Sequence, residues 1–293
     1  MTLPELISAC AAQLTSAGVS FGHGTTDAHD EAAWLTLWQL DLPLDSDPET
    51  LDRDLTHDEI QAVHALINQR ITTRKPAAYL TQEAWLLGVP FYIDERSIVP
   101  RSFIAELLAE GSIDYWLGPH TQRVLDLCTG NGSLAVLAAM TYPDTTVVGA
   151  DLSNDALAVA RINVDRHGLA SRISLVHSDG LQQVPGQFDL ILCNPPYVCA
   201  ASMAALPAEF QAEPELALAG GEDGMDFVRQ LLAQAPEHMT SNAVLVLEIG
   251  HERAHFENAF PQLEVIWLET TAGEDQVLLV TSQALRQLHS LSL

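Results

Sequence analysis

The second half of the chain alternates short apolar runs with segments of helical periodicity. Runs such as "DLILC" and "AVLVLEI" are apolar at nearly every position, which is the pattern of parallel strands buried on both faces. Segments such as "NDALAVARINVDRHG" repeat apolar residues with helical spacing and end at Gly168, which suits a helix C-terminus. This alternation predicts a doubly wound α/β sheet with strands at 123–128, 146–151, 173–177, 188–193, 243–249, 263–268 and 276–281.

The first quarter of the chain has a helical pattern. In "TTDAHDEAAWLTLWQL", Asp27 can cap a helix whose apolar stripe includes Trp34 and Trp38, which we expect to lie in a core. In "LTHDEIQAVHALINQRITTR", Thr56 leads a second helix whose apolar residues share one face. Residues 1–75 are therefore predicted to form a small helical domain.

Residues 76–100 change character between these two parts. They are bounded by prolines and are rich in aromatic and β-branched residues around Gly88, which indicates a β-hairpin. The predicted organisation is a helical domain over 1–75, a hairpin linker over 76–100 and an α/β domain over 101–293. Because the helical part carries none of the ligand-binding patterns described below, we expect it to select a partner without taking part in chemistry.

A glycine-containing loop follows the first predicted strand, in "LDLCTGNGSLAV". Gly130 and Gly132 permit a tight turn and let a ligand approach the backbone, and the next helix offers its N-terminal N–H groups. Asp151 ends the following strand about 20 residues later, where a carboxylate can accept hydrogen bonds from both hydroxyls of a ribose. The pattern fits a dinucleotide such as NAD, and it also fits S-adenosylmethionine.

Two further acids favour S-adenosylmethionine. Asp126 lies inside the first strand and resembles the acidic residue with which methyltransferases hold the loop of the methyl donor. Asp179 follows the third strand in "VHSD", where it can accept a hydrogen bond from an adenine amino group. We therefore predict that the methyl donor binds at this edge of the sheet.

Asn-Pro-Pro-Tyr follows the fourth predicted strand and should face the same crevice as the glycine loop. The Asn194 side-chain oxygen and the Pro195 carbonyl can accept both N–H groups of a planar amide or amino group, which aims the nitrogen lone pair at the methyl carbon. Pro195 and Pro196 stiffen the turn, and Tyr197 offers a ring face. The four residues predict methyl transfer to a planar nitrogen of adenine, cytosine or a glutamine side chain.

Charge restricts the partners. The formal net charge is −26, and Lys75 is the only lysine, so we expect no direct binding to a nucleic-acid backbone. An acidic surface can attract a basic protein, or it can serve only solubility. No apolar run approaches the length of a membrane helix and the first residues lack a signal-peptide pattern, so we expect a soluble, cytoplasmic protein.

Disulfides and metal sites are not expected from the sequence. The four cysteines are scattered and form no C-x-x-C pair: Cys10, Cys128, Cys193 and Cys199. Histidines in the helical half are expected in surface and capping roles and not as metal ligands: His23, His29, His57 and His64.

At this point the chain resembles the HemK/PrmB protein-glutamine methyltransferases. The resemblance rests on "DLCTGNGSLAV", "ADLSNDALAVARINVDRHGL", "NPPYV" and "EPELALAGGEDGMDFVRQLL", and it runs over nearly the whole chain. It implies a Rossmann-like seven-stranded methyltransferase sheet and transfer to a glutamine side-chain amide. The entry segment "FGHGTTDAHDEAAWLTLWQLDLPLD", "IVPRS" at 98–102 and Cys128 before Thr129 resemble the branch that modifies large-subunit ribosomal protein three.

The resemblance also assigns roles to individual residues. It implies that Asn194, Pro195, Pro196 and Tyr197 hold the glutamine, with Asn194 also bordering the donor. Residues implied to hold the donor are Asp126, Cys128, Thr129, Gly130, Asn131, Gly132, Asp151, Asp179 and Gly180, with Pro100 and Arg101 at its methionine end. Gly180 departs from the family, whose members carry a bulky side chain there, so we expect a looser adenine pocket.

Four alternatives remain open from the sequence. The release-factor branch of the same family is the first alternative, although it usually has Pro-Arg-Pro followed by acidic residues where this chain has "PRS" and glycine where it has Cys128. A nucleic-acid adenine methyltransferase would share Asn-Pro-Pro-Tyr but should add a basic groove, which this chain lacks. A NAD-dependent oxidoreductase would share the glycine loop but leaves Asn-Pro-Pro-Tyr unexplained, and an inactive binding scaffold would leave the donor motifs unexplained. The sequence does not fix the oligomeric state.

Overall fold

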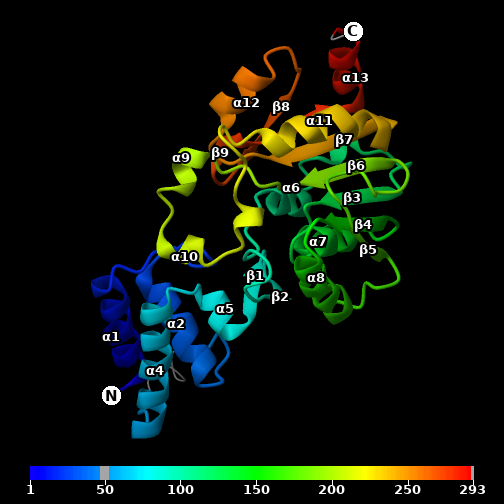
Figure 1. The fold of residues 1–293 in the computed structure, drawn as a ribbon. Helices are drawn as coiled ribbons and strands as arrows, with labels where there is room; N and C mark the ends of the chain where they lie inside the picture. Colours follow the sequence, from blue (N-terminus) through cyan, green and yellow to red (C-terminus); the bar gives the residue numbers. More distant parts are fainter. Residues whose placement is uncertain (47–52, 292–293) are drawn as a thin grey trace.

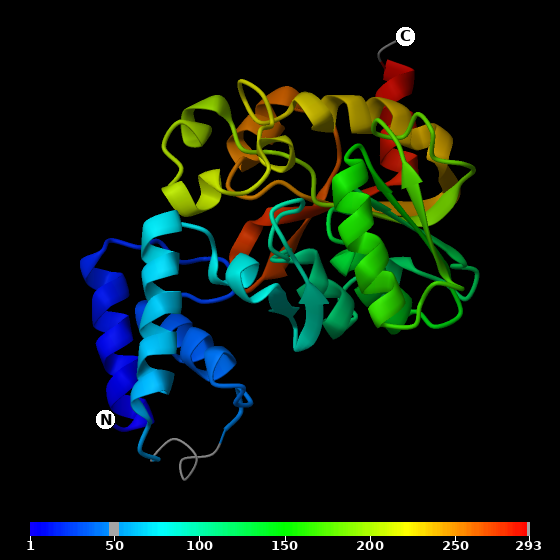
Figure 2. The same cartoon turned by 60° about the horizontal axis from the view of Figure 1, so that its bottom comes forward.

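A computed structural model describes residues 1–46 and 53–291 (Figure 1). The first described part of the chain includes three helices, and Figure 2 shows them as a group apart from the sheet. They are α1 (Leu3–Ser16), α2 (Ala28–Gln39) and α4 (His57–Thr73). Asp27 caps α2 by accepting hydrogen bonds from the backbone N–H groups of His29 and Asp30, as predicted. Thr56 and Glu59 form a capping box at the start of α4.

A shared apolar core fixes the position of these helices. Their buried faces pack together with the hairpin region and with Val159 of the α/β part. Trp34 is buried in this core, as predicted, whereas Trp38 is 38% exposed at its margin. The helical part therefore does not form an isolated core, because residues beyond position 75 complete it.

The predicted hairpin is shorter than the segment 76–100. Its strands are β1 (Glu83–Leu86) and β2 (Val89–Tyr92), paired antiparallel. Leu87 and Gly88 both have positive φ, which is the geometry of a two-residue turn that matches the strand twist. The start of the segment was predicted wrongly, because residues 77–81 form the short helix α5 (Ala77–Thr81).

The α/β part contains a seven-stranded sheet with strand order β5-β4-β3-β6-β7-β9-β8. The chain leaves β3 toward β4 and β5, then returns to the other side of β3 with β6, so a topological switch point lies between β3 and β6. The strands are β3 (Arg123–Leu127), β4 (Thr146–Asp151), β5 (Ile173–His177), β6 (Phe188–Cys193), β7 (Met239–Glu248), β8 (Ile266–Thr270) and β9 (Gly273–Thr281).

Helices cover both faces of this sheet. Buried residues of α6, α7 and α8 pack on one face and those of α11, α12 and α13 on the other. The bounds of these helices are α6 (Ile104–Glu110), α7 (Ser133–Thr141), α8 (Asn154–Arg166), α11 (Asp226–His238), α12 (Arg253–Ala259) and α13 (Ser282–Leu291). Short helices α9 (Ala200–Met203) and α10 (Ala208–Gln211) follow β6, and single 3-10 turns lie at Asp114–Trp116 and Glu215–Ala217.

The first four predicted strands are confirmed, whereas the starts of the last three were predicted wrongly: β8 begins at Ile266 and not at 263, and β9 begins at Gly273 and not at 276. β7 begins at Met239, before the predicted position 243. The prediction missed this start because the exposed polar residues Ser241 and Asn242 interrupt the apolar pattern. β8 and β9 form a hairpin, so β9 runs antiparallel to its neighbours in an otherwise parallel sheet. No helix in the described part of the chain combines the length and apolarity needed to cross a membrane.

Candidate active site

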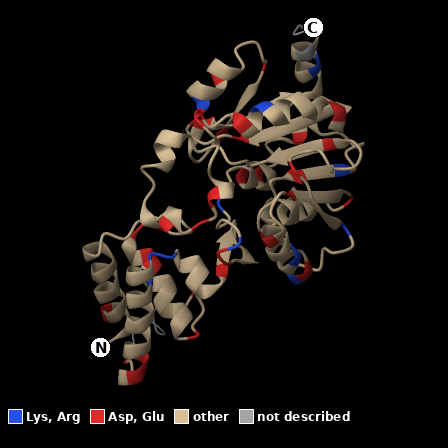
Figure 3. Ribbon diagram, in the orientation of Figure 1, with Lys and Arg blue, Asp and Glu red and all other residues tan. Residues whose placement is uncertain are grey.

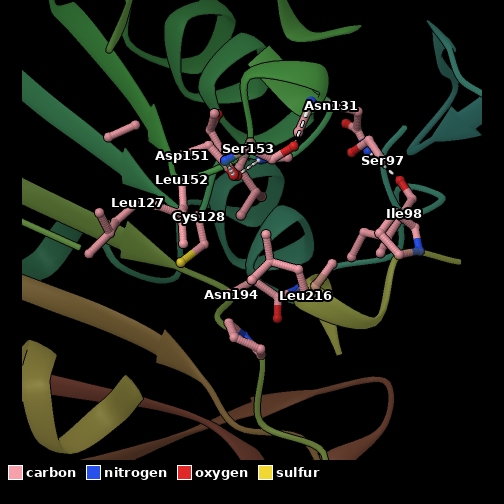
Figure 4. A pocket seen from close by; sticks show the side chains of 18 of the residues that line it. Ser97, Ile98, Leu127, Cys128, Asn131, Asp151, Leu152, Ser153, Asn194 and Leu216 are labelled. Carbon is pink, nitrogen blue, oxygen red and sulfur yellow. Dashed lines mark hydrogen bonds between the residues drawn. The ribbon is translucent and has the colours of Figure 1, made fainter. Parts of the chain in front are cut away.

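A cavity lies outside the carboxyl ends of β3, β4 and β6, at the switch point (Figure 4). Eleven of the predicted site residues line it: Pro100, Arg101, Cys128, Thr129, Gly130, Asn131, Asp151, Asp179, Gly180, Asn194 and Pro196. Four do not: Asp126, Gly132, Pro195 and Tyr197. The fold therefore brings the two predicted motifs, the glycine loop and Asn-Pro-Pro-Tyr, to one cavity.

Asp151 fixes the glycine loop from the end of β4. One carboxylate oxygen accepts the Gly130 N–H at 2.8 Å and the other accepts the Ser153 N–H at 2.8 Å. Burial raises the pKa of Asp151, and these backbone hydrogen bonds oppose the rise. Each oxygen keeps acceptor capacity for a second hydrogen bond, which is what two ribose hydroxyls require.

Asp126 acts behind the loop and not on the cavity surface. It is buried, and its Oδ2 accepts hydrogen bonds from the Thr129 hydroxyl and from the Ala135 N–H at the start of α7. Burial raises its pKa to about 7 against these hydrogen bonds. Asp126 therefore sets the shape of the loop between β3 and α7.

Gly132 has a packing role. Its φ is +80°, and a Cβ there would lie 3.0 Å from the Ala160 Cβ of α8, closer than side chains normally pack. Asn131 holds the same loop, because its Nδ2 donates to the Ile98 carbonyl at 2.8 Å and its Oδ1 accepts the Ser133 N–H at 2.9 Å. The loop is thus pre-formed by protein contacts, with Gly130 turned to the cavity.

Asn194 enters the cavity directly after β6 and is half-buried (Figure 4). The next residue, Pro195, is buried behind it. The hydroxyl of Tyr197 points toward Glu248 of β7, with 3.4 Å between Oη and Oε1, so its ring belongs to the wall behind the cavity. The structure therefore gives Tyr197 a supporting position where the sequence predicted a contact surface for the substrate.

Three glycines hold this loop, and the sequence reasoning missed their role. A Cβ on Gly220 would lie 2.7 Å from the Tyr197 Cα, and one on Gly224 would lie 2.2 Å from the Tyr197 carbonyl oxygen. A Cβ on Gly250 would lie 2.6 Å from the Tyr197 ring. The available signal was the glycine-rich run "GGEDG", together with the glycine that follows β7.

Glu213 is a second residue that the sequence did not reveal. This buried carboxylate accepts two hydrogen bonds of 2.7 Å from Arg101 and one of 2.9 Å from the Val99 N–H. His23 was predicted wrongly as a surface or capping residue, because it is buried with its Nε2 3.3 Å from this carboxylate. Burial alone would raise the pKa of Glu213, but His23 and Arg101 outweigh it and lower the pKa to about 2. A charged Glu213 therefore holds Arg101 at the cavity wall.

The predicted adenine end of the cavity lies at Asp179 and Gly180. Asp179 is exposed, and its Oδ2 accepts a hydrogen bond of 3.1 Å from Gln182. Gly180 has a φ of +55°, and a Cβ there would lie 3.0 Å from Gln230 Nε2 and 3.8 Å from the Phe227 ring. Residues of α11 therefore border the space that a bulky side chain at Gly180 would take.

Comparisons with known proteins agree with this geometry. Residues 105–221 match the "Methyltransferase small domain" family model. Among solved structures, the hMettl16 catalytic domain in complex with a MAT2A 3'UTR hairpin has a TM-score of 0.52 at 14% identity, covering 80% of this chain and 83% of that one. At that identity the likeness shows the fold alone, a Rossmann-like α/β methyltransferase.

Three curated relatives match nearly the whole chain. Those of Burkholderia pseudomallei and Neisseria gonorrhoeae are 50% and 46% identical, each over 97% of this chain and 95% of the relative. That of Bradyrhizobium diazoefficiens is 44% identical over 96% of this chain and 91% of the relative. All three are named ribosomal protein uL3 glutamine methyltransferase. With this identity along both its helical and its α/β parts, the chain belongs to the family of the ribosomal protein uL3 glutamine methyltransferases.

Proposed function

We propose that this protein transfers a methyl group from S-adenosylmethionine to the side-chain amide nitrogen of a glutamine in ribosomal protein uL3. The observation that carries the proposal is that Asp151 and Asn194 line one cavity at the switch point of the sheet. Asp151 can accept hydrogen bonds from the ribose of the donor, and Asn194 can accept one from the amide of the substrate. The names of the relatives supply the protein substrate.

The residues of the cavity fit the donor. Ser97 lines the cavity near Gly130, and its buried hydroxyl has no hydrogen-bond partner within the described protein, so a ligand can satisfy it. Asp151 offers acceptor positions for ribose hydroxyls, and the exposed carboxylate of Asp179 offers one for an amino group. When bound, S-adenosylmethionine supplies a methyl group on a positively charged sulfur.

Asn194 positions the acceptor amide. An amide nitrogen is a poor nucleophile because its lone pair is delocalised into the carbonyl group. Acceptance of its two N–H groups by the Asn194 Oδ1 and the Pro195 carbonyl would orient the nitrogen toward the methyl carbon. With S-adenosylmethionine bound, its methyl group would be transferred to this nitrogen with the sulfur as leaving group, and one N–H proton would then leave to solvent. Positioning, rather than a strong base, would supply most of the catalysis.

The helical part is proposed to recognise the protein substrate, whereas residues 101–293 carry the chemistry. Support comes from contacts that join the helices to the segment after Asn-Pro-Pro-Tyr. Arg70 and Arg74 of α4 and its cap both contact Glu209, at 3.4 Å and 3.0 Å. The same segment contributes Pro214 and Leu216 to the cavity wall. A partner bound at the helices would therefore lie beside the route to the active site.

The partner is proposed to be basic, and no direct contact with nucleic acid is proposed. Acidic side chains outnumber basic ones by 39 to 13. In Figure 3 the acidic residues are spread over both the helical and the α/β parts, and most arginines lie beside them. Such a surface attracts a basic protein over distances of about 10 Å at moderate salt.

A methyl-transfer assay tests the substrate. Ribosomal proteins from a strain that lacks this activity would be incubated with the enzyme and isotopically labelled donor, followed by peptide mapping. We expect label on one glutamine of uL3 and none on a peptide release factor tested in parallel. Label on the release factor or on RNA alone would refute the proposed substrate.

A cross-linking experiment tests the proposed role of the helices. Carbodiimide couples carboxylates directly to lysines, which suits a chain with 39 acidic residues and a basic substrate. With S-adenosylhomocysteine present, mass spectrometry should place cross-links to uL3 on acids within residues 1–75. Cross-links confined to residues 101–293 would contradict the recognition role while leaving the methylation assay unaffected.

A further inference from the structure

A cluster of three different metal-ligating side chains lies behind the Asn-Pro-Pro-Tyr loop. In the described ranges 1–46 and 53–291, one set of this kind is found, formed by Cys199, Glu252 and His255. One potential ligand atom from each residue lies within 4.8 Å of the other two. We propose that Cys199, Glu252 and His255 bind a Zn²⁺ ion.

The ligands come from two elements that meet beside the active site. Cys199 is the N-cap of α9, two residues after Tyr197, while Glu252 and His255 lie at the start of α12. Figure 1 shows α9 near α12, and a 3.5 Å contact joins the Cys199 N–H to Glu252 Oε1. An ion bound here would connect the loop that carries Asn194 to α12.

The side chains are placed to converge. The Cys199 residue is 7% exposed, so its sulfur faces the protein interior. The Glu252 side chain is 12% exposed and has one oxygen 2.5 Å from His255 Nδ1. A Cβ on Gly224 would lie 3.4 Å from the Glu252 Cγ, so the stem of this glutamate lies beside the segment 220–224. Only the His255 side chain is substantially exposed, which leaves a path for the ion.

The charge at Glu252 favours a cation. Of the four other buried glutamates in the described chain, Glu248 accepts hydrogen bonds from neutral groups, and the other three each contact an arginine: Glu31, Glu209 and Glu213. Glu252 is nearly as buried, but its only ion-pair partner within the described residues is His255, which is neutral unless protonated. A divalent ion would supply the missing positive charge and would bind the imidazole in its neutral form.

The ligand types select Zn²⁺ among divalent metals. Thiolate and imidazole ligands suit zinc, whereas magnesium and calcium require mainly oxygen ligands. Tetrahedral zinc has bonds of about 2.0–2.3 Å, which place its ligand atoms roughly 3.3–3.8 Å apart. The widest pair of the cluster therefore has to close by at most about 1–1.5 Å, and the Glu252 oxygen and His255 Nδ1, now 2.5 Å apart, have to separate by about 1 Å. Ser202 Oγ, 3.3 Å from the Cys199 sulfur, or a water molecule can complete the fourth position.

Metal binding to the full-length protein tests the site without reference to activity. Purified apoprotein would be titrated with Zn²⁺ in competition with a chromophoric chelator, and separately with Co²⁺ while its absorption spectrum is recorded. We expect one equivalent of Zn²⁺, and a thiolate-to-cobalt charge-transfer band that shows coordination by sulfur. Because the cobalt spectrum uses the unmodified protein, it does not depend on whether a variant folds.

Substitutions of the proposed ligands test whether the ion binds at this cluster. Cys199→Ser and His255→Gln should each weaken Zn²⁺ binding by at least about tenfold, since even loss of an outer hydrogen-bond partner of a zinc ligand has that effect. The matched control is His251→Ala, which removes an exposed histidine four residues before His255. Absence of the cobalt–thiolate band, or equal Zn²⁺ affinity in the ligand variants and the control, would overturn the proposal and leave Glu252–His255 as an ordinary ion pair.

Discussion

Arg101 and Glu213 form a two-point contact at the wall of the active-site cavity, with each guanidinium Nη atom donating a hydrogen bond of 2.7 Å to a different carboxylate oxygen. The two residues are 112 positions apart in sequence. Arg101 belongs to the segment that follows the hairpin, and Glu213 to the segment that follows Asn-Pro-Pro-Tyr. His23 brings the helical part to the same carboxylate. One buried glutamate thus positions three separate parts of the chain.

Glu213→Gln should strongly destabilise the fold. The substitution removes a buried negative charge and leaves Arg101 without its partner, which typically costs about 3–5 kcal/mol. The free energy of unfolding would be measured by denaturant titration. The matched control is Glu95→Gln, which breaks the exposed pair with Lys75 and should cost at most about 1 kcal/mol. Equal effects of the two substitutions would show that Glu213 is not the structural centre inferred here.

Glu248 should make stability fall as pH rises. Burial raises its pKa to about 7, against hydrogen bonds from Ser102 and the Phe103 N–H. In the unfolded chain a glutamate has a pKa of about 4.3, so the folded state holds the proton more tightly. The stabilisation from this group is therefore complete below about pH 4 and is lost as pH rises toward 7.

Glu248→Gln isolates this contribution, because it removes the titrating group at nearly constant size. The stability advantage of the wild type over the variant should shrink between about pH 5 and about pH 8. Thermal unfolding of both proteins at the two pH values measures it. The control is Glu264→Gln, which changes an exposed acid. Its stability should differ from that of the wild type by the same small amount at both pH values. A pH-independent difference for Glu248→Gln would contradict the assignment.

Asp151→Ala should weaken donor binding. It removes the proposed ribose acceptor and frees the Gly130 N–H, and hydrogen bonds to charged groups contribute about 1.5–3 kcal/mol. Isothermal calorimetry with S-adenosylmethionine measures the change, with Asp155→Ala on the exposed first turn of α8 as control. Unchanged donor affinity in Asp151→Ala, or tighter binding of NAD than of the donor, would count against the site.

Asn194→Ala should separate binding from chemistry. Donor affinity should remain close to that of the wild type, while methyl transfer falls at least about a hundredfold, as is usual when a preorganised polar group at a reacting centre is removed. Asn194→Asp keeps an acceptor oxygen but loses the N–H₂ group. Its rate of methyl transfer should therefore also fall strongly, but by less than that of Asn194→Ala. Single-turnover assays give both rates, and wild-type rates in two folded variants would rule out an amide-binding role for Asn194.

Gly250→Ala should displace Tyr197 and thereby slow methyl transfer. The added Cβ would lie 2.6 Å from the Tyr197 ring, at a φ of +54°. Overpacking of this kind usually costs about 1–3 kcal/mol of stability. The matched control is Gly168→Ala, which has a φ of +67° but nothing within 4 Å of the added atom. If both variants lose the same activity and stability, backbone strain rather than contact with Tyr197 is responsible.

Local signals in the sequence predicted most of the fold. The caps at Asp27 and Thr56 work through neighbouring backbone groups, so they are readable from a few residues. The central strands are readable because burial on both faces leaves continuous apolar runs. The glycine loop and Asp151 meet because the carboxyl ends of adjacent parallel strands lie at one edge of the sheet.

The features that the sequence did not reveal depend on contacts between distant segments. Glu213 reads as a surface acid, and only its position between Arg101 and His23 makes it a buried anchor. The glycines at 220, 224 and 250 could be read as turn formers, yet their importance here is the space they leave for Tyr197. The antiparallel direction of β9 is likewise set by a tight connection to β8, which apolar patterning does not report.

Glu209, in the segment between β6 and α11, limits how the two halves of this protein can be exchanged. It is encoded with the catalytic half, but the arginines that contact it in the described chain, Arg70 and Arg74, belong to the helical half. A chimera that joined this catalytic half to unrelated helices would leave the buried carboxylate of Glu209 without a counterion, whereas Glu213 would keep Arg101. If the helices recognise the substrate as proposed, a new specificity would arise by substitution within them and not by exchange of the whole module.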